Sequence, residues 1–390
     1  MLIVLLASTV CSAVPAMSSP TAATAVSVQA PVQLPPVLPI TRVADVDLAG
    51  SGIPRVGVIV AARDGGVVVA VPHDEQIAVI GPNGKIVQKI GGAGSGKGQF
   101  TGLGALGWVG DTLWAADNEL KRITLFSPAG FGVARVVPAV TAAIHGPSGD
   151  VEPFPLALRP GALVALYPNG SGLYNTLIGA GSVVPADWHR PSGGGPGILL
   201  RADAAGRYRQ LIEWLDPTFC SPGVPTLFCP RLLSSVSADG GVVADAYAPT
   251  AGADSGAMIV TVRDGNGRVL YTHRYPMQLT AVTSRDADSL MRRYAVPGKA
   301  SGSAGAFHPT IYAPLQAIIA TRDSSVWIGE RTTAAGTRWL LLDAIGKLRG
   351  AVLLPPGVRL RAADRGALWA TEGDGTPQPH LIRYVVTLPR

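Results

Sequence analysis

One short pattern of residues recurs six times along the chain. Each copy consists of an apolar stretch, a tight turn containing Gly or Asp, and a second apolar stretch that often carries Trp. This pattern predicts a β-hairpin between half-buried strands. A repeated supersecondary unit restricts the chain to folds that place copies of one unit side by side. The six copies occupy residues 61–68, 106–114, 158–164, 237–243, 321–327 and 363–369.

A second predicted hairpin follows most of these copies. Its turn ends in Gly, which suits a turn that requires positive φ. Two hairpins in series form a four-stranded antiparallel meander, which is one blade of a β-propeller. The second hairpins occupy residues 79–86, 125–130, 199–207, 262–269 and 341–348. The sequence therefore predicts an all-β, six-bladed β-propeller of four-stranded antiparallel blades.

The sixth copy lacks a second hairpin and is followed by one strand, residues 381–387. A blade of three strands would leave an open sheet edge. We expect the N-terminal strand near residues 40–48 to fill this place and close the last blade. One short helix is predicted in a loop insertion, from Thr283 to about Tyr294, because Thr283 and Asp286 resemble a capping box.

The first 39 residues are expected to precede the propeller domain, residues 40–390. Residues 1–16 combine a short apolar run with small residues at Val14 and Ala16, which is typical of a secretory signal peptide. Residues 17–39 are rich in Ala, Pro, Ser and Thr and predict an extended tether. We therefore expect a secreted or periplasmic monomer with no transmembrane segment in the mature chain, and no lipid on Cys11 because Val10 precedes it.

Two cysteines follow the predicted signal peptide, Cys220 and Cys229. In an oxidising compartment they indicate one local disulfide bond. A zinc-binding pair is the alternative, although no further Cys and no adjacent His completes it.

Charge and motifs argue against several functions. The net charge is +6, but the basic residues are scattered, so we expect no nucleic-acid partner. Residues 91–97 have the phosphate-loop spacing G-x-x-x-x-G-K, yet Gly98 stands where that loop needs Ser or Thr and no helix follows, which favours a turn between blades. Neither a G-x-S-x-G nor an H-E-x-x-H motif occurs, so no catalytic residue and no metal ligand is assigned.

The Gly-rich residues 90–100, the segment Leu113-Trp114-Ala115-Ala116-Asp117 and the segment Lys121-Arg122-Ile123 resemble NHL-type six-bladed propellers. The resemblance covers the first two blades closely and loosens beyond Val137, where insertions lengthen the repeat. The remainder resembles uncharacterised bacterial extracytoplasmic propellers of this kind. The resemblance implies the fold, and it implies that Asp117 braces a turn, but a propeller fold does not specify a function.

The long connections of the predicted propeller share one face. They comprise residues 138–153, 167–197, 216–230 and 277–313. Insertions confined to one face of a repeat array commonly mark its binding face. The candidate binding residues on this face are His73, Asp74, Asp117, His145, Trp188, His189, His308, Glu330 and Glu372, and His380 also lies there.

Two functional hypotheses follow. The first is an extracytoplasmic binding module for an unknown protein or small-molecule ligand, with no cofactor indicated. The alternative is a metal-dependent propeller lyase or hydrolase whose site, at the loop-rich mouth of the channel, would use Zn²⁺ or Ca²⁺. No repeated His/Glu ligand pattern is present in the sequence to support the alternative.

Overall fold

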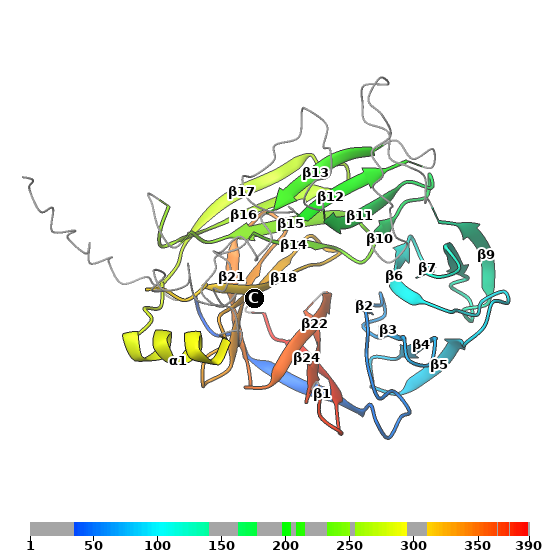
Figure 1. Cartoon of the computed structure of the whole chain (residues 1–390), viewed down its shortest axis with the longest axis horizontal. Coiled ribbons are helices and arrows are strands. Elements are labelled where there is room, and N and C mark those ends of the chain that lie inside the picture. Colours follow the sequence, from blue (N-terminus) through cyan, green and yellow to red (C-terminus); the bar gives the residue numbers. More distant parts are fainter. Residues whose placement is uncertain are drawn as a thin grey trace, which may run out of the picture. The chain divides into compact units, whose positions relative to one another are not determined.

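The short apolar stretches pair into six four-stranded antiparallel sheets. The computed structural model describes residues 35–139, 163–177, 197–203, 208–214, 232–249, 254–294, 310–364, 366–373 and 375–388. The sheets belong to one compact unit, Leu34–Arg390, and are arranged in a ring (Figure 1). The chain is a six-bladed β-propeller. This confirms the fold class that the repeats predict.

Each blade begins with the strand nearest the centre of the ring and ends with the strand at the rim (Figure 1). The first three blades comprise β2 (Ile59–Ala61), β3 (Val67–Val71), β4 (Gln76–Ile80) and β5 (Ile86–Gly91); β6 (Leu103–Val109), β7 (Thr112–Asp117), β8 (Arg122–Phe126) and β9 (Val133–Pro138); and β10 (Leu163–Leu166), β11 (Gly172–Leu177), β12 (Gly197–Ala202) and β13 (Tyr208–Trp214). The next two comprise β14 (Leu233–Val236), β15 (Val242–Tyr247), β16 (Ala257–Asp264) and β17 (Val269–Pro276); and β18 (Leu315–Ala320), β19 (Val326–Glu330), β20 (Thr337–Leu342) and β21 (Leu348–Leu354). Blade six comprises β22 (Val358–Asp364), β23 (Ala367–Glu372), β24 (His380–Val386) and β1 (Ile40–Asp47).

The N-terminal strand closes the ring, as the sequence predicts. β1 pairs antiparallel with β24, from Ile40 opposite Val386 to Asp47 opposite His380. Pairing with the rest of the ring begins slightly earlier in the chain. The Leu38 N–H donates to the Ala351 carbonyl at 2.6 Å, so the N-terminal segment contacts the rim of blade five before it completes blade six.

Short polar side chains organise the hairpin turns. Asp64 Oδ1 accepts a hydrogen bond from the Gly66 N–H at 2.9 Å, and Asp239 Oδ1 accepts one from the Gly241 N–H at 3.1 Å. These are Asx turns, in which the side chain replaces a backbone carbonyl. They explain why the Asp-Gly signals in the sequence mark the hairpins correctly.

The third hairpin differs from its predicted position. Residues 163–164 belong to β10, and the turn of this hairpin is at residues 167–171, where Asn169 Oδ1 accepts from the Ser171 N–H at 3.1 Å. The expected insertion at residues 167–197 therefore contains β11, and the connection after β11 is residues 178–196. The prediction failed because Pro160-Gly161 and Pro168-Asn169-Gly170 are both turn sequences, and only strand pairing distinguishes them.

The predicted helix is confirmed. α1 (Ser284–Tyr294) lies in the link between β17 and β18, and Thr283 caps its first turn. The Asp286 N–H donates to Thr283 Oγ1 at 3.1 Å, and Thr283 Oγ1 donates to Asp286 Oδ2 at 2.8 Å. No helix in the described ranges has both the length and the apolar character needed to cross a membrane.

Apolar side chains of adjacent blades form the core. Trp114, Trp327 and Trp369 occupy the second strands of their blades and are at most 1% exposed. Large aromatic side chains at these positions bury much apolar area between neighbouring sheets. The predicted signal peptide, most of the tether and the pair Cys220 and Cys229 lie outside the described residues and stay predictions.

Candidate functional site

The two faces of the propeller carry different connections. Because the blades are meanders, the first and third turns share one face, which we call the hairpin face. The second turns and the links between blades share the other, which we call the loop-rich face. The four longest connections between described strands, residues 139–162, 178–196, 215–232 and 277–314, all belong to the loop-rich face.

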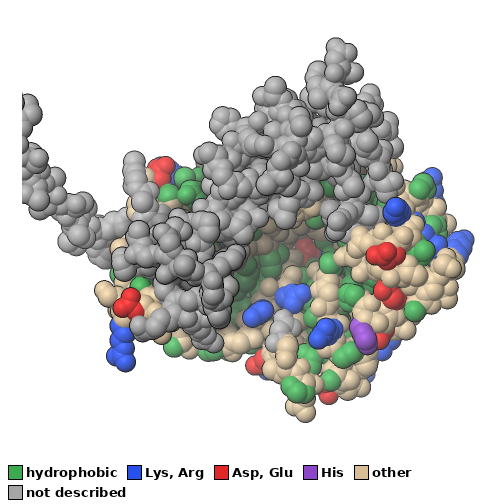
Figure 2. All heavy atoms as spheres, viewed as in Figure 1, with side chains coloured by type: hydrophobic (Ala, Val, Ile, Leu, Met, Phe, Trp, Pro, Cys, Tyr) green, Lys and Arg blue, Asp and Glu red, His purple; other side chains and the backbone are tan. Residues whose placement is uncertain are grey.

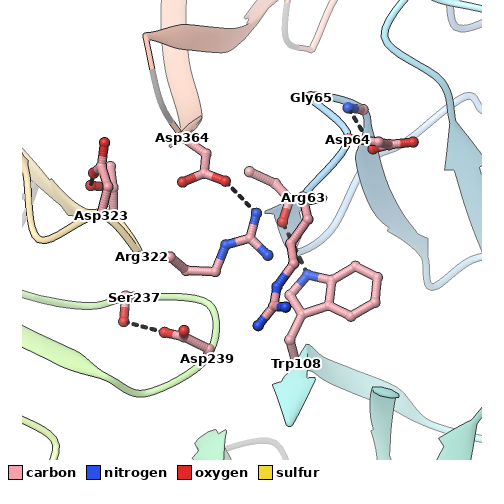
Figure 3. A network of polar contacts seen from close by, with 12 residues as sticks. Arg63, Asp64, Gly65, Trp108, Ser237, Asp239, Arg322, Asp323 and Asp364 are labelled. Atoms are coloured by element: carbon pink, nitrogen blue, oxygen red, sulfur yellow. Dashed lines mark hydrogen bonds and ion pairs between the residues drawn. The ribbon is translucent and has the colours of Figure 1, made fainter. Parts of the chain in front are cut away.

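Trp108 joins three blades at the hairpin end of the channel (Figure 3). Its backbone N–H donates to the Ala238 carbonyl of blade four at 2.8 Å, and its indole Nε1–H donates to the Ala61 carbonyl of blade one at 3.0 Å. The side chains of Arg63 and Arg322 point toward this indole (Figure 3). Hydrogen bonds that cross between blades narrow this end of the channel and fix the positions of the innermost strands.

Two arginines at this end form ion pairs. Arg322 Nη2 donates to Asp364 Oδ2, and the two side chains are only 9% and 5% exposed. Near them, Arg63 lies 2.6 Å from Asp111, in an ion pair that is more than half exposed. Arg322 Nη1 and Asp364 Oδ1 are buried and have no hydrogen-bond partner among the described residues. A buried polar atom without a partner pays a desolvation cost that a bound group could remove.

Asp323 follows Arg322 in the turn between β18 and β19, on the hairpin face (Figure 3). Burial raises the pKa of its carboxyl, but hydrogen bonds from Thr321 and Ser325 outweigh burial and hold that pKa below its usual value. The Ser325 Oγ–H donates to Asp323 Oδ1 at 2.7 Å. The Asp323 carboxylate is therefore already hydrogen-bonded by residues of its own turn, Thr321 and Ser325.

An inner cavity of about 210 Å³ lies between the innermost strands β2, β14, β18 and β22. Its walls are mainly aliphatic, with Arg322 and Arg361 among the few polar side chains. Figure 2 shows hydrophobic side chains around the hollow at the centre of the molecule and Lys or Arg side chains at its edge. The channel thus combines an apolar interior with guanidinium groups.

A larger groove of about 520 Å³ adjoins this cavity, and Arg361 lines both. Blade five contributes residues of β18 and β20 and the turn after β19, and blade six contributes residues 357–361. These segments lie toward the loop-rich face. We call this space the blade 5–6 groove.

Two arginines of the innermost strand β22 line the blade 5–6 groove. Arg359 is exposed and makes no ion pair with any described residue. Arg361 Nη2 donates to the Gly57 carbonyl at 3.0 Å, which positions its guanidinium between blades one and six. β22 has a bulge between Leu360 and Ala362, and Arg361 is the extra residue. Bulges commonly re-aim a side chain next to a site.

Hydroxyl groups and an indole complete the lining of the groove. Thr332 Oγ1 donates to Gln316 Oε1 at 3.0 Å and lies 2.6 Å from Thr337 Oγ1. Trp339 also lines the groove, and its buried Nε1–H has no partner among the described residues. The groove therefore combines the two arginines with a polar hydroxyl wall and an aromatic side chain.

Asp117 and Glu330 are both held by other protein groups. Asp117 is fully buried; its Oδ2 accepts from the Thr101 N–H at 2.8 Å and its Oδ1 accepts from two N–H groups of the following turn. This is the bracing role that the NHL resemblance implies. Both Glu330 oxygens accept from Arg338, beside a pocket of about 250 Å³ in which the Arg331 guanidinium lies over the Tyr312 ring.

The other described candidates lie apart from these. His73 and Asp74 occupy the turn between β3 and β4 of blade one. Glu372 and His380 lie on the two middle strands of blade six, β23 and β24, where His380 Nδ1 is 2.8 Å from Asp45 Oδ1 and Glu372 is 3.9 Å from Arg42. The structure does not gather these residues into one site, and the described ranges contain no group of three His, Cys, Asp or Glu side chains placed to hold a metal ion.

His145, Trp188, His189 and His308 lie outside the described residues, so their role stays a prediction. Arg359 and Arg361 are not among the residues that the sequence predicts for the site, because that prediction rests on histidine, acidic and aromatic residues near loops and these arginines lie on a strand. The alternation Val358-Arg359-Leu360-Arg361 at the start of an innermost strand was the available signal. Arginine at alternate positions of a strand is unusual where both faces of the sheet pack against neighbouring blades, so it marks a place where the strand borders an open space.

No protein-family model matches the chain, and no curated protein matches it in sequence. Among solved structures, a member of the DUF4221 family from Bacteroides vulgatus has 10% identity, covers 92% of this chain and 98% of its own, and has a TM-score of 0.48. Virginiamycin B lyase from Staphylococcus aureus has 11% identity over 90% of this chain and 100% of its own, with a TM-score of 0.41. The calcium-binding protein regucalcin from Agrobacterium tumefaciens has 10% identity over 91% of this chain and 98% of its own, with a TM-score of 0.39. With all three TM-scores below 0.5, the propeller assignment rests on the strand pairing itself.

Proposed function

We propose that this propeller is an extracytoplasmic, non-catalytic binding module that takes a small anionic molecule in the blade 5–6 groove. The observation that carries the proposal is that Arg359 and Arg361 line one groove of about 520 Å³ and that Arg359 has no carboxylate partner among the described residues. This volume lies within the usual range for small-molecule sites, about 300–1,000 Å³.

Guanidinium groups are the protein's best donors for planar anions. Their rigid fork matches the oxygens of a carboxylate or phosphate, and hydrogen bonds to charged groups are stronger than neutral ones. The Gly57 carbonyl already holds one of the two arginines, so part of the ordering cost is met before a ligand binds. The hydroxyls of Thr332 and Thr337 bond to Gln316 and to each other, so they form a polar wall and the arginines are the donors to the ligand.

The loop-rich face also carries the long connections that include His145, Trp188, His189 and His308. We propose these residues, with His73 and Asp74, as further contacts to a ligand that extends beyond the groove. Loops on a rigid scaffold commonly supply such contacts.

The test is calorimetric titration of the full mature chain with inorganic phosphate, citrate and hexanoate. We expect at least one of these anions to bind, and Arg359→Ala to weaken that binding about tenfold or more, as removal of a charged hydrogen bond implies. Arg359→Lys should retain part of the affinity because the charge remains. Arg285→Ala, which removes an exposed arginine on α1, is the matched control and should leave affinity unchanged.

The proposal fails if none of the three anions binds in the millimolar range or tighter. It also fails if Arg359→Ala behaves like Arg285→Ala. Thermal unfolding of each variant in the absence of anion separates a lost contact from a lost fold.

The extracytoplasmic location has its own test. We propose that residues 1–16 are removed on export and that Cys220 and Cys229 form a disulfide bond. Thiol labelling of the unfolded but unreduced mature protein should then find no free cysteine, and labelling after reduction should find two. A free thiol before reduction would contradict the disulfide.

A further inference from the structure

The inner cavity and the blade 5–6 groove adjoin at Arg361, which lines both spaces. The groove follows residues 316–317 of β18 and 357–361 of β22, and the cavity follows the next residues of the same two strands, 318–322 and 361–363. A molecule held by the arginines of the groove therefore has an adjoining space along the innermost strands.

The walls of this cavity favour an aliphatic group over water. Ile59, Val236, Ile318 and Ile319 line it together with several alanines. Water needs two to four polar partners to occupy a cavity, whereas an apolar cavity of about 150 Å³ stays dry and binds benzene. At about 210 Å³, the inner cavity has room for a somewhat larger hydrocarbon.

Its far end carries one unused donor. Arg322 lines the cavity, and its buried Nη1 has no hydrogen-bond partner among the described residues. The charge of Arg322 is already balanced by Asp364, so this end favours an uncharged oxygen over a second anion. A hydroxyl or carbonyl oxygen would accept from Nη1 and remove the cost of leaving that donor unpaired.

We propose that the ligand is an amphiphilic monocarboxylate. Its carboxylate lies at Arg359 and Arg361, its aliphatic chain enters the inner cavity, and an uncharged oxygen at the far end of the chain accepts from Arg322 Nη1. The residues from Arg359 to Ala363 of a strand span roughly 13 Å at about 3.3 Å per residue, which corresponds to a chain of about ten carbons. This inference rests on the proposed function of the groove.

Chain length is the direct test. Acetate, butanoate, hexanoate, octanoate and decanoate are titrated into the full mature chain by calorimetry. Burial of each methylene should improve the affinity about fourfold until the cavity is filled. 10-Hydroxydecanoate should bind more tightly than decanoate, because only the hydroxy acid offers an acceptor to Arg322. A hydroxyl that weakens binding would contradict the contact with Arg322.

Filling the cavity is the second test. Val236→Phe and Ile319→Phe place bulk into the cavity from two different strands. Each should abolish the gain with chain length while leaving the affinity for acetate unchanged. Val87→Phe, which adds the same bulk at an exposed position of β5, is the matched control and should keep the gain. Two filling variants are used so that misfolding of one, detected by circular dichroism, does not remove the test.

The outcomes separate this inference from the proposed function. Carboxylates that bind through Arg359 with no dependence on chain length would overturn the inference and leave the groove as an anion site. A gain with chain length that survives both filling variants would also overturn it. Failure of every carboxylate and of inorganic phosphate to bind would overturn the proposed function itself.

Discussion

The two ends of the channel use arginine in opposite ways. At the hairpin end, Arg322 is 9% exposed and forms an ion pair with Asp364, which comes from the neighbouring blade. In the blade 5–6 groove, Arg359 is exposed and makes no ion pair among the described residues. The same type of residue thus stabilises the ring at one end, as Arg322, and faces the groove at the other, as Arg359.

The difference follows from solvation. A guanidinium withdrawn from water loses hydration, which only a well-placed anion compensates, so a buried arginine needs a protein carboxylate. An exposed arginine keeps its hydration and can exchange water for a ligand at little cost. An arginine near the channel therefore indicates a ligand-binding site only where its side chain is exposed to solvent.

Breaking the hairpin-end pair should have the largest effect. Arg322→Met leaves the Asp364 carboxylate buried without its cation, and we expect a loss of about 3–5 kcal/mol in the free energy of unfolding. Equilibrium urea unfolding of the wild type and of Arg322→Met measures this loss. The double variant R322M/D364L removes both charges and should recover most of the loss. A double variant no more stable than R322M would contradict the assignment of the cost to an unpaired charge.

Replacing Trp108 by Phe tests the hydrogen bonds that narrow the same end. Trp108 Nε1–H donates to the Ala61 carbonyl, whereas the buried Nε1–H of Trp114 has no partner among the described residues. Trp114→Phe is therefore the matched control for lost volume. Trp108→Phe should cost about 1 kcal/mol more than this control in urea unfolding. Equal losses would show that the indole contributes by packing alone.

Lowering the pH should reveal how much the Asp323 carboxylate contributes to the stability of the fold. The pKa of this carboxyl is lowered in the folded protein, so its stabilising contribution is present above the ordinary value of 3.8 and is lost as the pH falls through the lowered pKa. Wild type should therefore lose more stability than Asp323→Asn when the pH falls from about 5 to about 2. Urea midpoints across this range measure it, and parallel curves would contradict the lowered pKa.

The smallest effect on stability is expected at Arg359. Arg359→Ala removes an exposed side chain that makes no ion pair among the described residues, so the free energy of unfolding should change by no more than about 0.5 kcal/mol. The same urea titration used for Arg322→Met provides the comparison. A loss of several kcal/mol would show that Arg359 is structural, and the contrast between the two ends would no longer hold.

Local signals made most of the fold predictable. Asp-Gly and similar turns between apolar stretches are short-range features, and five of the six hairpins fall where the sequence puts them. The hairpin of blade three was misplaced because two turn sequences lie close together, and only the pairing of β10 with β11 distinguishes them. The last repeat has only three strands of its own. The sequence therefore predicts that the N-terminal strand β1 supplies the fourth, as it does.

The candidate site was less predictable because it depends on distant partners. The sequence between β19 and β20 does not indicate that Arg338 binds both carboxylate oxygens of Glu330, and the bond from Arg361 to the Gly57 carbonyl joins residues 304 positions apart. The position of an arginine relative to the groove depends on which strand is innermost and on the bulge at Arg361. These facts exist only once the ring is assembled.

The pairing of β1 with β24 fixes the order of events during synthesis. Ile40 is made among the first residues of the domain, but its partner Val386 is among the last. Until β24 is made, β1 has no neighbour in blade six, and the incomplete blade presents an unpaired strand edge that can recruit another chain. Contacts this distant in sequence form slowly. Ring closure is therefore a late, single step, and a chain interrupted anywhere before residue 380 would be left with an open propeller.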